Sequence, residues 1–146
     1  MPARRTTSAY GPVSSFPAKI SSFLLQPVGT GRGNRLRGHM GRSFCARFGC
    51  SAAEPDRVLL ATASEDKTAR IWDAATGECV RILPGHKDEV LRVTWSPCGK
   101  LLVTGGAEGK AMVWRTTNDW RRTCTLEHGD GAQVYGCLFH EPHFVE

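Results

Sequence analysis

The chain of 146 residues has no acidic side chain before Glu54. Residues 1–53 contain eight Lys or Arg residues, whereas the rest of the chain contains eleven basic and fourteen acidic residues. Serine, glycine and proline are frequent in the first 37 residues, and such a composition buries little apolar surface. The sequence therefore predicts a largely disordered, basic tail over residues 1–37.

Long apolar runs and helical patterns are also missing. No apolar stretch approaches the roughly 20 residues that a membrane-spanning helix needs. No window of eleven or more residues has a clean 3.6-residue apolar period, so we expect little helix. The tail holds one apolar island, residues 20–28, which could add a strand to a neighbouring sheet.

The sequence lacks the spacings that hold metals and phosphates. Its six cysteines include no Cys-x-x-Cys pair, and no His, Cys or carboxylate cluster has the spacing of a zinc site. No glycine-rich run is followed by a helical pattern, which argues against a phosphate cradle. We therefore expect no metal and no cofactor. We interpret the cysteines as reduced core thiols, except Cys98, which lies in a predicted turn.

What the chain does contain is an internal repeat. Thr62 and Thr104 each precede a tryptophan by ten positions, and these tryptophans, Trp72 and Trp114, are 42 residues apart. A fixed period indicates a repeat architecture, in which each unit buries its apolar face against a neighbour. The first copy carries five extra residues around positions 49–57, which we interpret as an insertion in a loop.

Each copy has the pattern of four β-strands. Residues 90–95 alternate and are rich in β-branched and aromatic side chains, and residues 96–100 contain the proline and glycine of a turn. Two further strands follow at 101–104 and 111–114. The corresponding strands of the first copy are expected at 43–48, 58–62 and 69–72, with an outer strand at 78–83.

A third copy begins at His128 and is cut short. The run from Val134 to Phe139 matches the first strand of the earlier copies, but the tryptophan of this copy would fall beyond Glu146. We therefore expect two complete units and the first strand of a third. Because a closed ring needs typically four or more such units, the chain is expected to be a fragment of a longer protein.

The period and the residues resemble those of the WD40 family of β-propellers. The matching features are Gly38-His39 and Gly85-His86 at one end of each copy and Trp72-Asp73 at the end of the first. The resemblance implies an all-β fold, an incomplete β-propeller with two four-stranded blades and the first strand of a third. The expected boundaries are 38–84, 85–126 and, for the truncated repeat, 127–146.

The polar residues of each copy invite an enzymatic interpretation, but a structural one accounts for them better. A chain of hydrogen bonds from an indole N–H through a hydroxyl and an imidazole to a turn carboxylate satisfies polar groups that would otherwise be buried without partners. The resemblance implies that this network consists of His39, Thr62, Ser64, Asp66 and Trp72 in the first copy, and His86, Thr104, Glu108 and Trp114 in the second. Because Glu108 is longer than Asp66, we expect it to reach the turn N–H groups poorly.

The resemblance implies a non-catalytic scaffold for protein–protein interactions, with no small-molecule substrate. The candidate partner-binding face consists of residues that follow each histidine or lie at each tight turn: Arg42, Glu65, Lys87, Asp88, Glu89 and Ala107. Their mixed charge favours polar recognition of other proteins. The sequence does not identify the partner.

The basic tail leaves an alternative open, in which the chain associates with RNA. Lysine and arginine would neutralise phosphates there, although aromatic side chains for stacking are sparse. A mitochondrial transit peptide is disfavoured because Pro12, Pro17 and Pro27 interrupt any helix. We expect a cytoplasmic location, with the nucleus left open.

Overall fold

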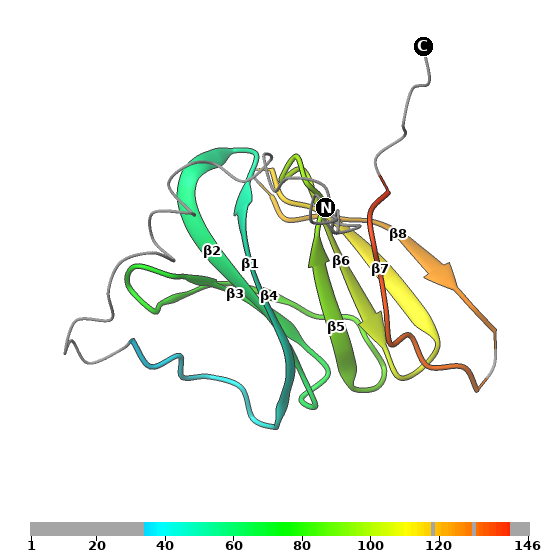
Figure 1. The fold of residues 1–146 in the computed structure, drawn as a ribbon. Helices are drawn as coiled ribbons and strands as arrows, with labels where there is room; N and C mark the ends of the chain where they lie inside the picture. The colour runs from blue at the N-terminus through cyan, green and yellow to red at the C-terminus, as the bar shows by residue number, and fades with distance from the viewer. Residues whose placement is uncertain (1–33, 118, 130, 141–146) are drawn as a thin grey trace, which may run out of the picture.

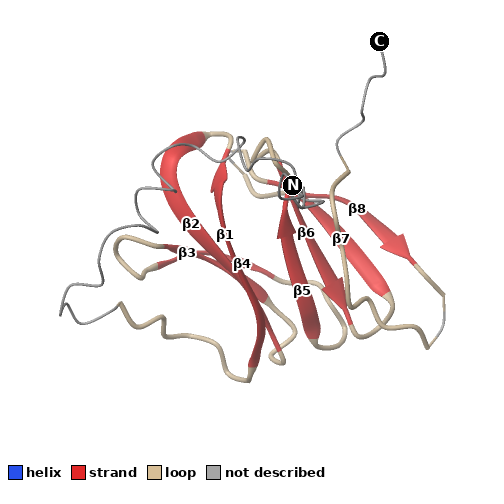
Figure 2. Cartoon of the chain, in the orientation of Figure 1, coloured by secondary structure: helices blue, strands red, loops and turns tan. Residues whose placement is uncertain are grey.

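The computed structural model describes residues 34–117, 119–129 and 131–140, which form two antiparallel β-sheets. The strands of the first sheet, in order, are β1 (Ser43–Ser51), β2 (Glu54–Ser64), β3 (Ala69–Asp73) and β4 (Cys79–Leu83). Those of the second are β5 (Val90–Trp95), β6 (Leu101–Gly106), β7 (Lys110–Arg115) and β8 (Arg122–Glu127). The two sheets stand side by side, and the described residues contain no helix (Figures 1 and 2). These findings confirm the prediction of an all-β chain with two four-stranded units.

The apolar core lies where the two sheets stack. The first sheet contributes small side chains, with Ala61, Ala63 and Ala69 fully buried, and these let β5 pack closely against β1 and β2. From the second sheet, Val90 and Val93 of β5 enter the same cluster. The sheets are therefore joined by apolar burial, which is the interaction expected between neighbouring repeats.

The interpretation of residues 49–57 as a loop insertion is wrong. The extra residues lengthen the β1–β2 hairpin, so that β1 has 9 residues and β2 has 11, whereas β5 and β6 have 6 each. The tip of the hairpin reaches the second sheet, where the backbone N–H of Ala52 donates to Gly99 O at 3.0 Å. The Ser51 hydroxyl donates to Thr116 O at 2.6 Å. Because these groups find partners there, the insertion is ordered as strand.

The predicted strand from Val134 to Phe139 is also wrong. Residues 132–140 run beside β5 without regular strand pairing. Their carbonyls accept hydrogen bonds from side chains of β5, with Arg92 Nε donating to Tyr135 O at 2.7 Å and Thr94 Oγ1 to Cys137 O at 2.8 Å. A strand needs a ladder of backbone bonds, and side-chain donors do not supply one.

Two other expectations have different outcomes. The predicted tail strand at 20–28 and most of the predicted disordered tail lie outside the described residues, which begin at Asn34.

The cysteines are free, as expected, but only Cys45 is buried, whereas Cys79 and Cys124 are exposed. The prediction of core thiols is therefore wrong for these two. No helix in the described part of the chain could span a membrane.

Candidate functional site

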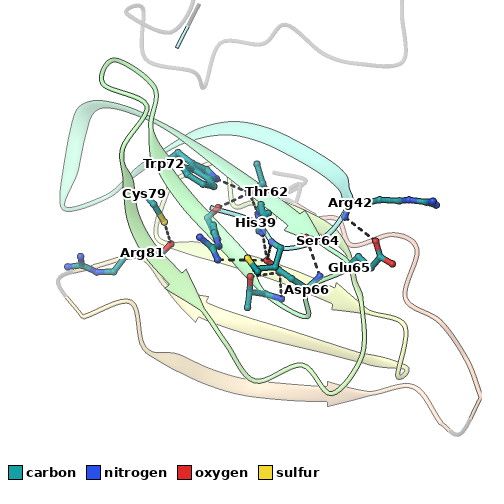
Figure 3. A network of polar contacts seen from close by, with 12 residues as sticks. His39, Arg42, Thr62, Ser64, Glu65, Asp66, Trp72, Cys79 and Arg81 are labelled. Carbon is teal, nitrogen blue, oxygen red and sulfur yellow. Dashed lines mark hydrogen bonds and ion pairs between the residues drawn. The ribbon is translucent and has the colours of Figure 1, made fainter. Parts of the chain in front are cut away.

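A chain of hydrogen bonds crosses the first sheet (Figure 3). Trp72 Nε1 donates to Thr62 Oγ1 at 2.8 Å, and the same hydroxyl lies 2.7 Å from His39 Nε2. The other imidazole nitrogen, Nδ1, lies 2.8 Å from Asp66 Oδ2. With a proton on Nδ1, each donor along this chain has one acceptor. The chain links β3, β2, the β2–β3 turn and the segment before β1.

The network is shielded from solvent. Trp72 is 2% exposed, and the His39 and Asp66 side chains are each 9% exposed. The His39 ring packs edge-on against the Trp72 ring, with centroids 5.8 Å apart. Polar groups buried in this way cost free energy unless they are paired, so the hydrogen bonds are a condition of the packing.

Asp66 fixes the turn between β2 and β3 as well as the imidazole. Its Oδ1 accepts from the backbone N–H of Thr68 at 3.1 Å and from the Thr68 hydroxyl at 2.6 Å, and its Oδ2 accepts from Met40 N at 3.1 Å. Burial opposes ionisation, but these bonds and the one from His39 outweigh it and hold the pKa of Asp66 well below its usual range. The sequence analysis missed Thr68, although an aspartate two residues before a threonine at a turn is a known local signal.

Ser64 has a different place from the other members of the predicted set. Its hydroxyl accepts from the backbone N–H of Asp66 at 3.2 Å and so caps the turn. The hydroxyl that contacts the imidazole and the indole is that of Thr62.

The second sheet repeats the chain with one change. Trp114 Nε1 donates to Thr104 Oγ1 at 3.0 Å, and His86 bridges this hydroxyl and Glu108 Oε1 at 2.7 Å on each side. Glu108 Oε1 also accepts from Lys87 N at 3.2 Å. The other carboxylate oxygen, Oε2, is buried and has no hydrogen-bond partner among the described residues. Glu108 thus holds the imidazole but does not bond to the β6–β7 turn as Asp66 bonds to the β2–β3 turn.

The longer carboxylate is accommodated by a glycine. Gly106 occupies the position of Ser64, and a Cβ atom placed there would lie 2.0 Å from Glu108 Oε2 and 2.5 Å from His86 Nδ1. Glu108 therefore fills the space that the side chain of Ser64 takes in the first sheet. The two differences between the repeats, serine to glycine and aspartate to glutamate, are coupled.

The six residues of the predicted face lie in the turns and strand starts at one end of the two sheets. Glu65 N donates to Arg42 O at 2.9 Å, and Ala107 N donates to Glu89 O at 2.8 Å, so the two pairs occupy equivalent positions in the two sheets. Lys87 and Asp88 are exposed. Lys67, which the sequence analysis missed, joins the two sheets here because its Nζ donates to Lys87 O at 3.0 Å.

The coupling between positions 106 and 108 predicts non-additive effects on stability. Gly106→Ser alone should destabilise the chain by roughly 1–3 kcal/mol because the new side chain meets the carboxylate and imidazole. Glu108→Asp alone should also destabilise, because the shorter carboxylate withdraws from His86. The double variant restores the arrangement of the first repeat. Its loss in free energy of unfolding, measured with urea, should therefore be smaller by about 1 kcal/mol or more than the sum of the losses in the two single variants. Additive losses would contradict the coupling.

The position of Asp66 predicts a loss of stability in acid. Its pKa in the folded state lies below the value of 3.8 expected when unfolded, so the contribution is complete above that value and is lost as the pH falls below it. Asp66→Asn should cost roughly 1–3 kcal/mol at pH 7 and should make unfolding less dependent on pH below about 4. Urea unfolding between pH 2.5 and 7 tests this, with Asp119→Asn as the control. If the free energy of unfolding of Asp66→Asn fell as steeply in acid as that of the unchanged chain, the prediction would be contradicted.

Comparisons with known proteins match this architecture. The family model described as WD domain, G-beta repeat matches residues 33–73 and 77–115. Nuclear distribution protein nudF of Aspergillus niger is 39% identical over 107 residues, covering 73% of this chain and 23% of that protein. Probable cytosolic iron-sulfur protein assembly protein Ciao1 of Culex quinquefasciatus is 39% identical over 97 residues, covering 63% of this chain and 27% of that protein.

A solved structure of a β-propeller domain is also similar in fold to this chain. The β-propeller domain of Cps50 (Swd1) from Myceliophteria thermophila superposes with a TM-score of 0.56 at 31% identity, covering 67% of this chain and 28% of that one. The matches to nudF and Ciao1 span about a quarter of each relative's length. With two matched repeats over more than half of its residues, the chain belongs to the WD40 repeat family.

Proposed function

We propose that the chain acts as a non-catalytic module for protein–protein interaction. The observation that carries this proposal is the division of its polar groups: those in the sheets bond to one another, whereas those in the turns at one end face solvent. The turns are held by backbone bonds between strands, which gives the exposed side chains fixed positions. A rigid, polar surface of this kind suits recognition of another protein.

The histidine, hydroxyl and acid of each repeat are poor candidates for catalysis. The Thr62 hydroxyl already accepts from Trp72 Nε1 and contacts His39, and the residue is only 6% exposed. A nucleophile must reach its substrate, and this oxygen is covered by the indole and the imidazole. The arrangement supports an internal brace in both repeats.

The proposed binding face consists of Arg42, Glu65, Lys87, Asp88, Glu89 and Ala107, with Lys67 added from the structure. The face carries both signs of charge, so a partner with a complementary mixed pattern would be favoured over a uniformly charged one. The relatives support the general role, since one of them is named as an assembly protein.

The relatives also bear on location and on the RNA alternative. Their names refer to the cytosol and to nuclear distribution, and we propose that this chain works in the cytoplasm, with the nucleus as the alternative. The RNA-binding alternative depends on the basic tail, of which residues 1–33 lie outside the described structure. The comparisons add no support for it.

Charge reversal tests the proposed face. Lys87→Glu combined with Glu89→Lys keeps the net charge but inverts the local pattern, so binding of specific partners should fall about tenfold or more. Affinity capture with quantitative mass spectrometry, followed by Kd measurement on the proteins retained by the unchanged chain, gives the readout. The matched control is Arg47→Glu with Glu78→Lys, which reverses exposed charges away from this face. Unchanged partners and affinities in the Lys87/Glu89 variant would refute the proposal.

A further inference from the structure

Lys67 has a backbone conformation that lysine rarely adopts. Its φ of 66° lies in the left-handed region, where a side chain crowds the backbone and glycine is favoured. The turn enforces this conformation, since the backbone N–H of Lys67 donates to Ser64 O at 3.3 Å and that of Ser64 donates to Thr68 O at 3.2 Å. Such conformations are concentrated at functional sites. The side chain of Lys67 is therefore a candidate for a function that glycine would not serve.

The second repeat has a glycine at the equivalent position. In both turns the N–H at this position donates to the carbonyl three residues earlier at 3.3 Å, and the φ of Gly109 is 80°. A Cβ atom on Gly109 would lie 2.6 Å from Ala132 O and 2.8 Å from Gly129 O. His128 N also donates to Gly109 O at 2.9 Å. The backbone of this turn thus meets the chain that follows β8 directly.

In the first repeat a side chain makes the corresponding connection. Lys67 is exposed, and its Nζ donates to Lys87 O at 3.0 Å. Lys87 lies in the loop of residues 84–89, which leads from β4 into β5. The bond therefore joins the β2–β3 turn of one repeat to the loop that begins the next. Because the donor is charged, the bond is stronger than one between neutral groups.

The other polar contacts of Lys87 are made to the second sheet. Its backbone N–H donates to Glu108 Oε1 at 3.2 Å. The pKa of the exposed Glu127 carboxyl is lowered, chiefly by its bond to Lys110 at 2.5 Å and also by the charge of Lys87, so the Lys87 ammonium lies on the side of β8. The bond from Lys67 is thus the polar contact that ties Lys87 to the first repeat.

We propose that Lys67 is a positioning residue of the binding face. Its ammonium holds the loop of residues 84–89 against the β2–β3 turn, so that charged side chains of both repeats, such as Glu65 and Lys87, form one surface with a fixed spacing. Glycine would relieve the backbone strain but has no donor that reaches the loop. The inference rests on the proposed function for its effect on partner binding, whereas the effect on the loop is independent of that function.

Lys67→Gly separates the positioning role from the folding of the turn. Because glycine adopts this conformation without strain, the urea midpoint of the variant should not fall. NMR of the full, isotopically labelled chain should nevertheless show a looser loop. We expect a changed carbonyl carbon shift at Lys87 and an amide order parameter at Asp88 that falls from about 0.85 toward about 0.6. Unchanged values at both residues would overturn the proposal, whatever the midpoint.

Two further variants test the ammonium group itself. Lys67→Met keeps a long side chain but has no donor, so the loop should loosen as in Lys67→Gly. Lys67→Arg keeps a charged donor and should leave the loop ordered. The matched control is Lys100→Met, which changes an exposed lysine in the β5–β6 turn and should leave the NMR values of the loop unchanged. Equal loosening in Lys67→Arg and Lys67→Met would rule out a role for the ammonium.

Partner binding distinguishes this inference from the proposed function. For the partners that the unchanged chain retains in affinity capture, Lys67→Gly should raise the Kd about threefold or more, since one hydrogen bond no longer orders the face. Lys67→Arg should bind like the unchanged chain. A loosened loop with an unchanged Kd would count against the proposed face. An ordered loop in Lys67→Gly would instead count against Lys67 as the positioning residue.

Discussion

The arrangement of each repeat depends on one buried donor, the indole N–H of Trp72 in the first repeat and of Trp114 in the second. It needs an acceptor, and the hydroxyl of Thr62 or Thr104 supplies one. That hydroxyl in turn contacts an imidazole, which contacts a carboxylate at a turn. Because an unpaired buried polar group costs about 1–3 kcal/mol, each residue in the chain constrains the next. The network therefore positions the turns as well as satisfying the sheet.

The two repeats meet this requirement with different residues. In the first, Asp66 bonds to the imidazole and the turn together, with Thr68 and Ser64 completing the turn. In the second, Glu108 extends into the space left by Gly106 and keeps the imidazole while one oxygen remains without a partner. The imidazole contact is thus retained when the turn contact is not. The carboxylate therefore fixes the β2–β3 turn in the first repeat, whereas in the second it holds the imidazole and the backbone N–H of Lys87.

Much of this fold could be predicted from the sequence because it depends on local periodicity. The strands around Trp72 and Trp114 follow from alternation and turn residues, and the spacing of the repeats shows which positions are equivalent. The hairpin insertion could not be placed, because its order depends on Gly99 and Thr116, which are distant in sequence. A cleft of about 240 Å³ beside Trp120, which is also lined by Ser51 and Thr116, could not be predicted for the same reason. Its walls come from both repeats, and a repeat pattern describes each unit separately.

The account depends on the tryptophan indoles being internal donors, and hydrogen exchange measures this directly. In a proton NMR spectrum of the full chain, the indole N–H signals of Trp72 and Trp114 should exchange with deuterium at rates limited by opening of the sheets. The signal of Trp120, whose indole has no partner within the described residues, should exchange quickly. Exchange of the Trp72 indole as fast as that of Trp120 would contradict the account.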